Sequence, residues 1–444
     1  MGDTGDGIAS PRWKSPIALT LSGVLLAATL TACSSTNTTS PTTASAASAA
    51  SSRSDIPPSA FNDHTGITST SVSVGNVSTL LAGLFKGAAV GTQAYADYVN
   101  SKGGINGRKI IVDSGDDNFS GAPNKQLTQA DIQKDFALVG GFSLDDSFGG
   151  TVLAANPQVP NVTVSLDLAT ANLANSFSPA PAANGWQQGP LAYFQRKYPS
   201  QILHTAALVA DPPSAVAKWT AEKAAMTQLG YKVVYDPTFD ITTTNFNQYV
   251  VAMKRDGVQI LFLEQMPQNY AASVVQALTQ QDFHPVLVLG GSTYSEALVP
   301  NSGGASAIDG SYLDQNTSLY LGEDAGTIPA VGTFLSWIQK ASPGFKADLY
   351  TLFGWLSAEL FSQALASAGA HPSRGSVLEA LHGITSFSGG NLVGTANPAK
   401  KIPTTCYMIG RIEGGRFNRL DDPPVSSATH GYRCDQPFYY LKAA

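Results

Sequence analysis

Residues 99–110 read VNSKGGINGRKI, and this stretch decides how the chain around it folds. The adjacent glycines Gly103-Gly104 end the helical period of the preceding residues, because glycine readily adopts the left-handed conformation that closes a helix. Asn106-Gly107 is a turn-forming pair, and the β-branched residues after it favour a strand. The stretch therefore predicts a helix over residues 83–101, a tight turn, and a strand over residues 109–113.

The same alternation of short apolar runs and longer helical stretches continues on both sides of this turn. Further strands are predicted at residues 67–75, 136–140, 161–165, 205–211, 231–235, 258–265, 285–290 and 310–313. Further helices are predicted at residues 187–197, 330–341 and 350–368. Strands that alternate with helices are typical of a parallel sheet, so the expected fold class is α/β with doubly wound, Rossmann-like units.

The alternation of predicted strands and helices is interrupted twice, which favours a division into two lobes. Residues 179–185 (PAPAANG) form a Pro/Gly-rich crossing, and a Gly/Ser-rich stretch lies near residues 295–318. We expect a signal at 1–32, a flexible spacer at 33–65, a first lobe from 66–180 and 309–385, and a second lobe from 181–308 and 386–444.

The N-terminal segment has the profile of an export signal. No charged residue lies between Lys14 and Arg53, and residues 17–30 are apolar or small, a run too short to span a bilayer as a stable helix. The run ends at Leu30-Thr31-Ala32-Cys33, which resembles the lipobox of bacterial lipoproteins. The resemblance implies lipidation of Cys33 and cleavage before it. A plain signal peptide or an uncleaved anchor helix is the alternative.

The segment after Cys33 has almost nothing to bury. Residues 34–54 contain eight Ser, five Thr and five Ala among 21 residues, so we expect a disordered spacer. Across the whole chain the net charge is −6 and charged residues make up only 13%. This composition argues against binding to nucleic acid. The common nucleotide-binding, hydrolase and metalloprotease motifs do not occur, so we expect no enzymatic activity, no cofactor and no metal.

Residues 99–110 closely resemble the N-x-x-G-G-I-N-G-R-K-I turn of the type I periplasmic binding proteins, the branched-chain amino-acid binding group of ABC-transporter solute receptors. The resemblance continues through Asp116-Asp117 and residues 136–141 and 160–165, and it covers roughly residues 66–420. It implies two lobes joined by a three-segment hinge, with a ligand cleft between them.

In function, the resemblance implies a monomeric solute-binding protein that is lipid-anchored at the outer face of the cell membrane. Such a protein closes on a small polar molecule, such as an amino acid or amide, and delivers it to an ABC permease. A ligand-sensing receptor of the same fold is the first alternative, and an extracytoplasmic enzyme is the second.

Ligands of open parallel sheets bind at the carboxyl ends of the strands, so the candidate ligand-binding residues lie just past them. They are Ser143, Ser147, Ser165 and Asp167 in the first lobe, and Glu264, Gln265, Ser292 and Tyr294 in the second. In the family, a serine after the V-G-G strand and the backbone of the loop that matches residues 165–169 hold the ligand's carboxylate. Ser143 and Ser147 both fit that serine. The serines could instead be simple helix N-caps.

The sequence departs from the family pattern at several site positions. Asp145 and Asp146 lie beside the candidate serines, where two carboxylates work against an anionic ligand unless they point to solvent. The family's Tyr-Gly pair after Asp211 is missing, and so is its acid after Gly290, which would meet an ammonium group. Glu264 or Tyr294 could substitute for them.

Two cysteines remain in the exported part of the chain. Cys406 and Cys434 are 28 positions apart, and a disulfide is the natural expectation outside the cytoplasm. Two free buried thiols are the alternative.

Overall fold

The computed structural model describes residues 55–420, 429 and 431–441. Two sheets within this range define two lobes, one of five strands and one of seven. Cys33, the expected signal and most of the expected spacer lie outside the described residues. Among the helices of the described part, none is long and apolar enough to cross a membrane.

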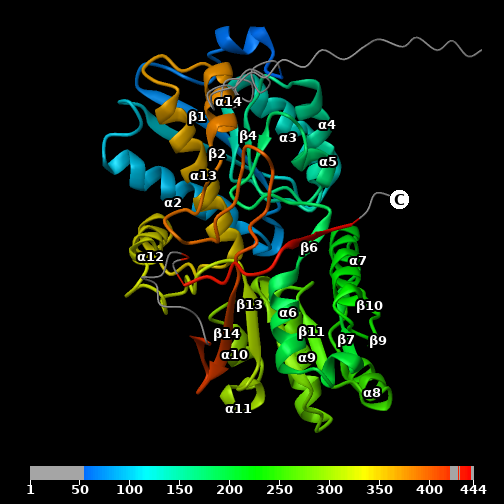
Figure 1. Cartoon of the computed structure of the whole chain (residues 1–444). Helices are drawn as coiled ribbons and strands as arrows, with labels where there is room; N and C mark the ends of the chain where they lie inside the picture. The colour runs from blue at the N-terminus through cyan, green and yellow to red at the C-terminus, as the bar shows by residue number, and fades with distance from the viewer. Residues whose placement is uncertain (1–54, 421–428, 430, 442–444) are drawn as a thin grey trace, which may run out of the picture. The chain divides into compact units, whose positions relative to one another are not determined.

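The sheet of the first lobe is entirely parallel, in the order β2-β1-β3-β4-β5. Its strands are β1 (Ser71–Ser78), β2 (Lys109–Asp116), β3 (Ala137–Val139), β4 (Asn161–Val162) and β5 (Ser176–Phe177). Figure 1 shows α2 (Lys86–Ser101) and α13 (Leu349–Ser367) together on one side of this sheet, and α3 (Gly121–Lys134) and α4 (Asp146–Ala155) on the other.

Two glycines allow α2 and α13 to pack backbone against backbone. A Cβ on Gly91 would lie 1.9 Å from the carbonyl oxygen of Thr351, and a Cβ on Gly354 would lie 2.1 Å from that of Ala88. Any larger residue would force the two helices apart. This close contact fixes α13 in the core, as its nearly continuous apolar sequence predicts.

The turn over residues 99–110 has the predicted form. Gly103 and Gly104 have φ values of 99° and 78°, and the backbone N–H of Gly104 donates to the carbonyl of Val99 at 3.0 Å, which closes α2. Asn106 and Gly107 also have positive φ, and β2 follows directly.

The sheet of the second lobe has the order β15-β14-β13-β12-β11-β7-β9. Its strands are β7 (Thr205–Ala207), β9 (Val233–Tyr235), β11 (Ile260–Leu263), β12 (Val286–Gly290), β13 (Tyr312–Gln315), β14 (Met408–Glu413) and β15 (Arg416–Arg419). β14 runs antiparallel to both of its neighbours, and the other pairs are parallel. β13 belongs to this sheet, although we expected the chain to return to the first lobe at residue 309.

Helices cover both faces of this second sheet. One apolar cluster joins α6 (Gln188–Lys197) and α7 (Pro213–Gln228) to side chains such as Phe262 and Tyr312, and another joins α8 (Asn247–Arg255) and α9 (Gln268–Gln280) to the opposite face. The doubly wound α/β class predicted from the sequence is thus confirmed.

The remaining elements are η1 (Pro58–Asn62), η2 (Leu81–Gly83), α5 (Leu168–Ala171), β6 (Gly185–Gln187), η3 (Gln201–His204), β8 (Val209–Ala210), β10 (Thr238–Phe239), η4 (Gly291–Thr293), α10 (Leu298–Asn301), α11 (Ala305–Ile308), α12 (Pro329–Ala341), α14 (Arg374–Gly383) and β16 (Phe438–Tyr440).

Residues 55–65, which we expected to belong to the flexible spacer, are folded against the first lobe. Ile56 and Ala60 are buried, and Asp63 forms an ion pair with the buried Arg374 at 2.9 Å. Residues 55–65 contain apolar side chains that anchor them to the lobe, whereas the Ser/Thr/Ala-rich sequence before them contains no comparable side chain.

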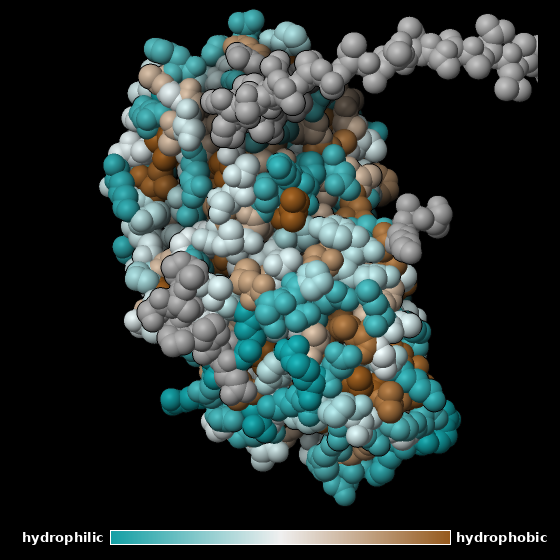
Figure 2. Space-filling view, viewed as in Figure 1, coloured by the Kyte–Doolittle hydropathy of each residue, from teal (hydrophilic) through white to brown (hydrophobic). Residues whose placement is uncertain are grey.

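The face of the molecule seen in Figure 2 is largely hydrophilic, and its apolar residues form small separate groups. This agrees with the burial of most large apolar side chains in the cores of the lobes.

The predicted disulfide is present in the structure. Cys406 Sγ lies 2.09 Å from Cys434 Sγ, and the bond joins the chain just before β14 to the segment that leads to β16. Tyr407, the neighbour of Cys406, exchanges two backbone hydrogen bonds with Arg433, both of 2.8 Å.

Candidate functional site

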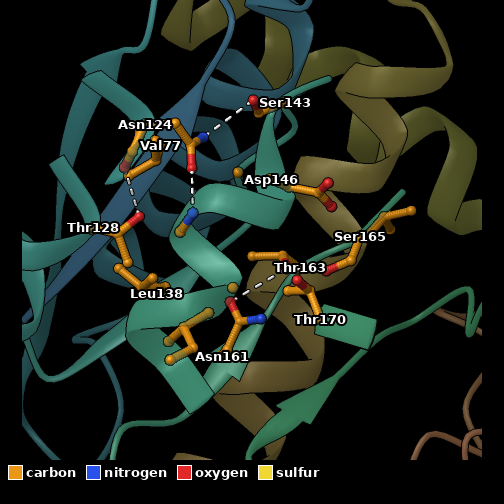
Figure 3. A pocket seen from close by; sticks show the side chains of 16 residues that line it. Val77, Asn124, Thr128, Leu138, Ser143, Asp146, Asn161, Thr163, Ser165 and Thr170 are labelled. Carbon is orange, nitrogen blue, oxygen red and sulfur yellow. Dashed lines mark hydrogen bonds between the residues drawn. The ribbon is translucent and has the colours of Figure 1, made fainter. Parts of the chain in front are cut away.

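A small cavity of about 40 Å³, lined by both polar and apolar residues, lies along the carboxyl-terminal part of the first sheet. Figure 3 shows its lining residues, which converge from β4 and its following loop, from α3 and from the start of α4. The polar ones are Asn124, Thr128, Ser143, Asp146, Asn161, Thr163, Ser165 and Thr170. This is the edge where open parallel sheets bind ligands, and a cavity of this size holds a few non-hydrogen atoms.

Ser143 is fully engaged in a buried hydrogen-bond network. Its hydroxyl donates to Asp117 in a short bond, and it accepts from Asn124 Nδ2 at 3.1 Å and from the backbone N–H of Asp145 at 2.9 Å. Asn124 Nδ2 also bonds Asp117 Oδ2 at 2.9 Å. Ser147, by contrast, is exposed on the first turn of α4. The two serines that the sequence left as alternatives therefore have different surroundings.

The most unexpected feature is the position of the Asp146 side chain. Its Oδ2 accepts hydrogen bonds from the backbone N–H groups of Leu166, at 2.7 Å, and Asp167, at 3.2 Å. Burial raises the pKa of Asp146 to about 6, against the opposing effect of these two bonds. The carboxylate thus uses backbone donors of the loop that we expected to hold a ligand's carboxylate, and it does not point away to solvent.

The two other candidates of the first lobe differ in role. Ser165 is buried and lines the cavity, with its hydroxyl 3.4 Å from that of Thr163. Asp167 caps α5, because its Oδ2 accepts from both the backbone N–H and the hydroxyl of Thr170, at 2.8 and 2.7 Å.

In the second lobe, three carboxyl groups gather at the ends of the parallel strands. Strand register pairs Leu263 with Leu289 and Gly290 with Asp314, so Glu264 lies beside Gly290 and on the same face as Asp314. Burial raises the pKa of Asp314 to about 7, and burial with the charges of Asp314 and Glu222 raises that of Glu264 well above its usual range.

Glu222 of α7 completes this group, which we call the acid cluster (Glu222, Glu264 and Asp314). It accepts a hydrogen bond from Gln265 Nε2 at 2.9 Å, and burial raises its pKa to about 8. One carboxyl oxygen of each acid, Glu222 Oε1, Glu264 Oε1 and Asp314 Oδ2, is buried and has no N–H or hydroxyl donor as a partner. Glu264 lies within hydrogen-bond reach of both Glu222 and Asp314, so the acids can share protons. Such acceptors are costly to leave unpaired, so the cluster suits protons or a ligand that donates.

The last two candidates of the second lobe serve internal contacts. The hydroxyl of Ser292 donates to the backbone carbonyls of Glu264 and Met266, at 3.0 and 2.8 Å. Tyr294 is only 1% exposed, and its hydroxyl donates to Glu323 Oε2 at 2.5 Å. Ser292 therefore stabilises the loop after Glu264, whereas Tyr294 connects the loop after β12 to residues 321–323.

Sequence reasoning missed Asn124, Glu222 and Asp314. Asp314 directly follows a predicted strand at residues 310–313, so the rule that selected Glu264 could have found it. Asn124 and Glu222 lie within helices, and nothing local distinguishes them from surface residues. Only the packing of α3 and α7 brings them to the strand ends.

A further acidic group lies away from these strand ends. Carboxyl oxygens of Asp113, Asp131 and Asp135 lie within 4.8 Å of one another. Lys134 already supplies a positive charge there, because its ammonium bonds Asp113 and lies 3.4 Å from Asp131 and 3.9 Å from Asp135. The group is therefore an ion-pair network.

Comparison with known proteins agrees with this architecture. The sequence profile of the family described as "Periplasmic binding protein" matches residues 73–416. A branched-chain amino-acid ABC transporter protein from Thermus thermophilus, solved with bound valine, is 14% identical and has a TM-score of 0.69. The alignment covers 82% of this chain and 98% of that one.

Two other solved structures show how varied the ligands of this fold are. The fatty acid ABC transporter substrate-binding protein from Thermomonospora curvata has a TM-score of 0.66 at 16% identity, over 82% of this chain and 95% of the other. A solute-binding protein from R. palustris, in complex with 4-hydroxybenzoate, has a TM-score of 0.65 at 16% identity, over 79% and 95%. No curated protein sequence gives a significant match.

The chain belongs to the periplasmic binding protein family, because the family's profile spans most of its length. Within that family its fold is the type I form, found in the substrate-binding proteins of branched-chain amino-acid ABC transporters. The similar structures are solute-binding proteins.

Proposed function

We propose that this chain is an extracytoplasmic solute-binding protein of an ABC importer, anchored to the membrane through lipid on Cys33. It binds a small polar molecule at the carboxyl ends of its two sheets, closes its lobes on it, and delivers it to a permease. The observation that carries the proposal is the concentration of buried polar groups at these strand ends, namely the polar residues that line the first-lobe cavity and the acid cluster of the second lobe.

Physical reasoning supports a binding role for these groups. Buried polar side chains cost free energy unless they are paired, and a ligand that pairs them recovers that energy when the lobes close around it. Closure also excludes water, which strengthens the hydrogen bonds inside. The family's solved members bind small molecules, among them valine and 4-hydroxybenzoate.

A ligand screen tests the binding role. Thermal unfolding of the full chain is measured with amino acids, amides, amines, polyols and small acids, and hits are confirmed by calorimetry. A ligand at 100 times its Kd stabilises the native state by about 2.7 kcal/mol, which is readily detected. A panel without any hit contradicts the proposal.

The anchor and the importer are tested separately. Cys33→Ala should abolish incorporation of labelled lipid and release the protein from the membrane fraction, whereas Cys406→Ser should leave both unchanged. Uptake of the identified ligand should fall in cells that lack this chain. Normal uptake in such cells would favour the ligand-sensing alternative.

A further inference from the structure

The ligand class can be narrowed from the position of Asp146 in the first lobe. We propose that Asp146 permanently occupies the backbone anion site of this lobe, so that the ligand presents a cationic group there, such as an ammonium or guanidinium, and no carboxylate. This inference rests on the proposed function and deepens it, because it names the chemistry of the transported solute.

Asp146 already accepts hydrogen bonds from the two backbone donors of the loop after β4. The backbone N–H groups of Leu166 and Asp167 follow β4, at the edge where an anion would bind. Both donate to Asp146 Oδ2, and Asp167 N lies 3.2 Å from Oδ1 as well. A carboxylate on the ligand would have to displace a carboxylate that is covalently attached and already placed.

Asp146 is the only charged residue in the lining of the first-lobe cavity. Asp146 lines the cavity together with amide and hydroxyl side chains, including Asn161, Thr163 and Ser165. None of the residues that line this cavity carries a positive charge. Among these lining residues a ligand anion would therefore meet the like charge of Asp146, whereas a cation would meet an acceptor.

The acid cluster of the second lobe points to the same chemistry. Glu222, Glu264 and Asp314 each keep a buried oxygen that no N–H or hydroxyl donor reaches, and Oε1 of the adjacent residue Gln315 is also buried without a partner. An ionised carboxyl group only accepts, so a solute that brings N–H or O–H donors could replace the protons that burial favours on these acids.

The first experiment compares two amino acids with analogues that lack either the carboxylate or the amine. Binding of leucine, 3-methylbutylamine and 4-methylpentanoate to the full chain is measured by calorimetry, together with arginine and agmatine. We expect the amines and agmatine to bind at least about tenfold more tightly than their carboxylate-bearing counterparts. Tighter binding of the carboxylates would overturn this inference and leave the proposed function intact. Absence of binding by these probes and by the wider screen would contradict both.

The second experiment tests the occupied site directly, without a ligand. Asp146→Ala removes the carboxylate and leaves the two backbone donors unpaired, so acetate should bind in its place and raise Tm by a few degrees relative to chloride at equal ionic strength. Asp145→Ala is the matched control, because Asp145 makes no side-chain cap bond to α4. An equal acetate effect on wild type and both variants would overturn the inference.

A third variant covers the case in which Asp146→Ala does not fold. Asp146→Asn keeps an acceptor oxygen for Leu166 and Asp167 but removes the charge. We expect its affinity for the best amine probe to fall at least about tenfold, with a change of less than about twofold in Asp145→Asn. Unchanged amine affinity in Asp146→Asn would show that the carboxylate does not select the ligand.

Discussion

Glu264 and Asp314 lie on either side of Gly290, at the carboxyl ends of three neighbouring parallel strands. The side chain of Glu264 lies over the glycine, since a Cβ on Gly290 would come within 2.9 Å of Glu264 Cα and 3.0 Å of its Cγ. The missing side chain of one strand therefore allows the carboxyl groups of the other two to approach.

Gly290→Ala should disturb this arrangement. The added methyl group overlaps backbone and side chain of Glu264, so we expect a loss of about 1 to 3 kcal/mol in the free energy of unfolding. Urea denaturation measures it. Gly332→Ala in α12 is the control, because nothing lies within 4 Å of its Cβ position and alanine favours a helix. Equal effects of the two substitutions would contradict the packing of Glu264 on Gly290.

The acid cluster should make stability depend on pH. The folded pKa of Glu222 is about 8 and that of Asp314 about 7, both raised mainly by burial, whereas unfolded carboxyl groups titrate near pH 4. The folded state therefore binds protons that the unfolded state has released. This contribution is fully present below about pH 4, and stability falls as the pH rises from there to about 8.

Glu222→Gln should reduce this dependence, because the amide cannot ionise. We expect the variant to be more stable than wild type at pH 8 by on the order of 2 kcal/mol, with a smaller difference at pH 5. Urea unfolding at both pH values is the measurement, and Glu413→Gln at an exposed position is the control. A difference that does not change with pH would argue against a buried proton at Glu222.

Arg374 fixes the segment before the first strand. It is 2% exposed, and its guanidinium donates to the carbonyls of Phe136 and Ile132, at 3.0 and 2.8 Å, as well as to Asp63. Arg374→Lys cannot reproduce this set of donors and should cost about 2 to 4 kcal/mol. The exposed Arg255→Lys should change stability by less than about 0.5 kcal/mol. Thermal and urea unfolding compare the two variants.

The disulfide between Cys406 and Cys434 should contribute to stability. It closes a loop of 28 positions, so the double variant Cys406→Ser with Cys434→Ser should lose about 3 to 4 kcal/mol. A reductant should lower the stability of wild type by a similar amount and leave the double variant unchanged. Peptide mapping without reduction verifies the bond, and a fragment with free thiols at both positions would refute it.

The two candidate serines should behave differently on substitution. Ser143→Ala leaves Asn124 and Asp117 without a buried partner and should cost about 1 to 3 kcal/mol, whereas Ser147→Ala at an exposed position should change stability by less than about 0.5 kcal/mol. Any effect of Ser147→Ala on ligand affinity would therefore report direct contact. Equal stability losses would contradict the network around Ser143.

Much of the fold could be predicted because its signals are local. The glycines of residues 99–110 end a helix and form a turn through their own backbone preferences, and the strand at residues 109–116 follows from its β-branched residues. The site was only partly predictable. Glu264 and Ser165 are candidates because they follow strands, but the contact between Asp146 and Leu166 joins residues twenty positions apart.

The sequence by itself determined the α/β class, the family and the cysteines of the disulfide, because each depends on residue types at short or fixed spacing. Tertiary structure alone decided that β13 joins the second sheet, that residues 55–65 are folded, and that Asp146 takes the backbone donors of its lobe. The physical reason is that these outcomes depend on strand register and on burial between distant segments. Local conformational preferences determine neither the strand register nor the burial between distant segments.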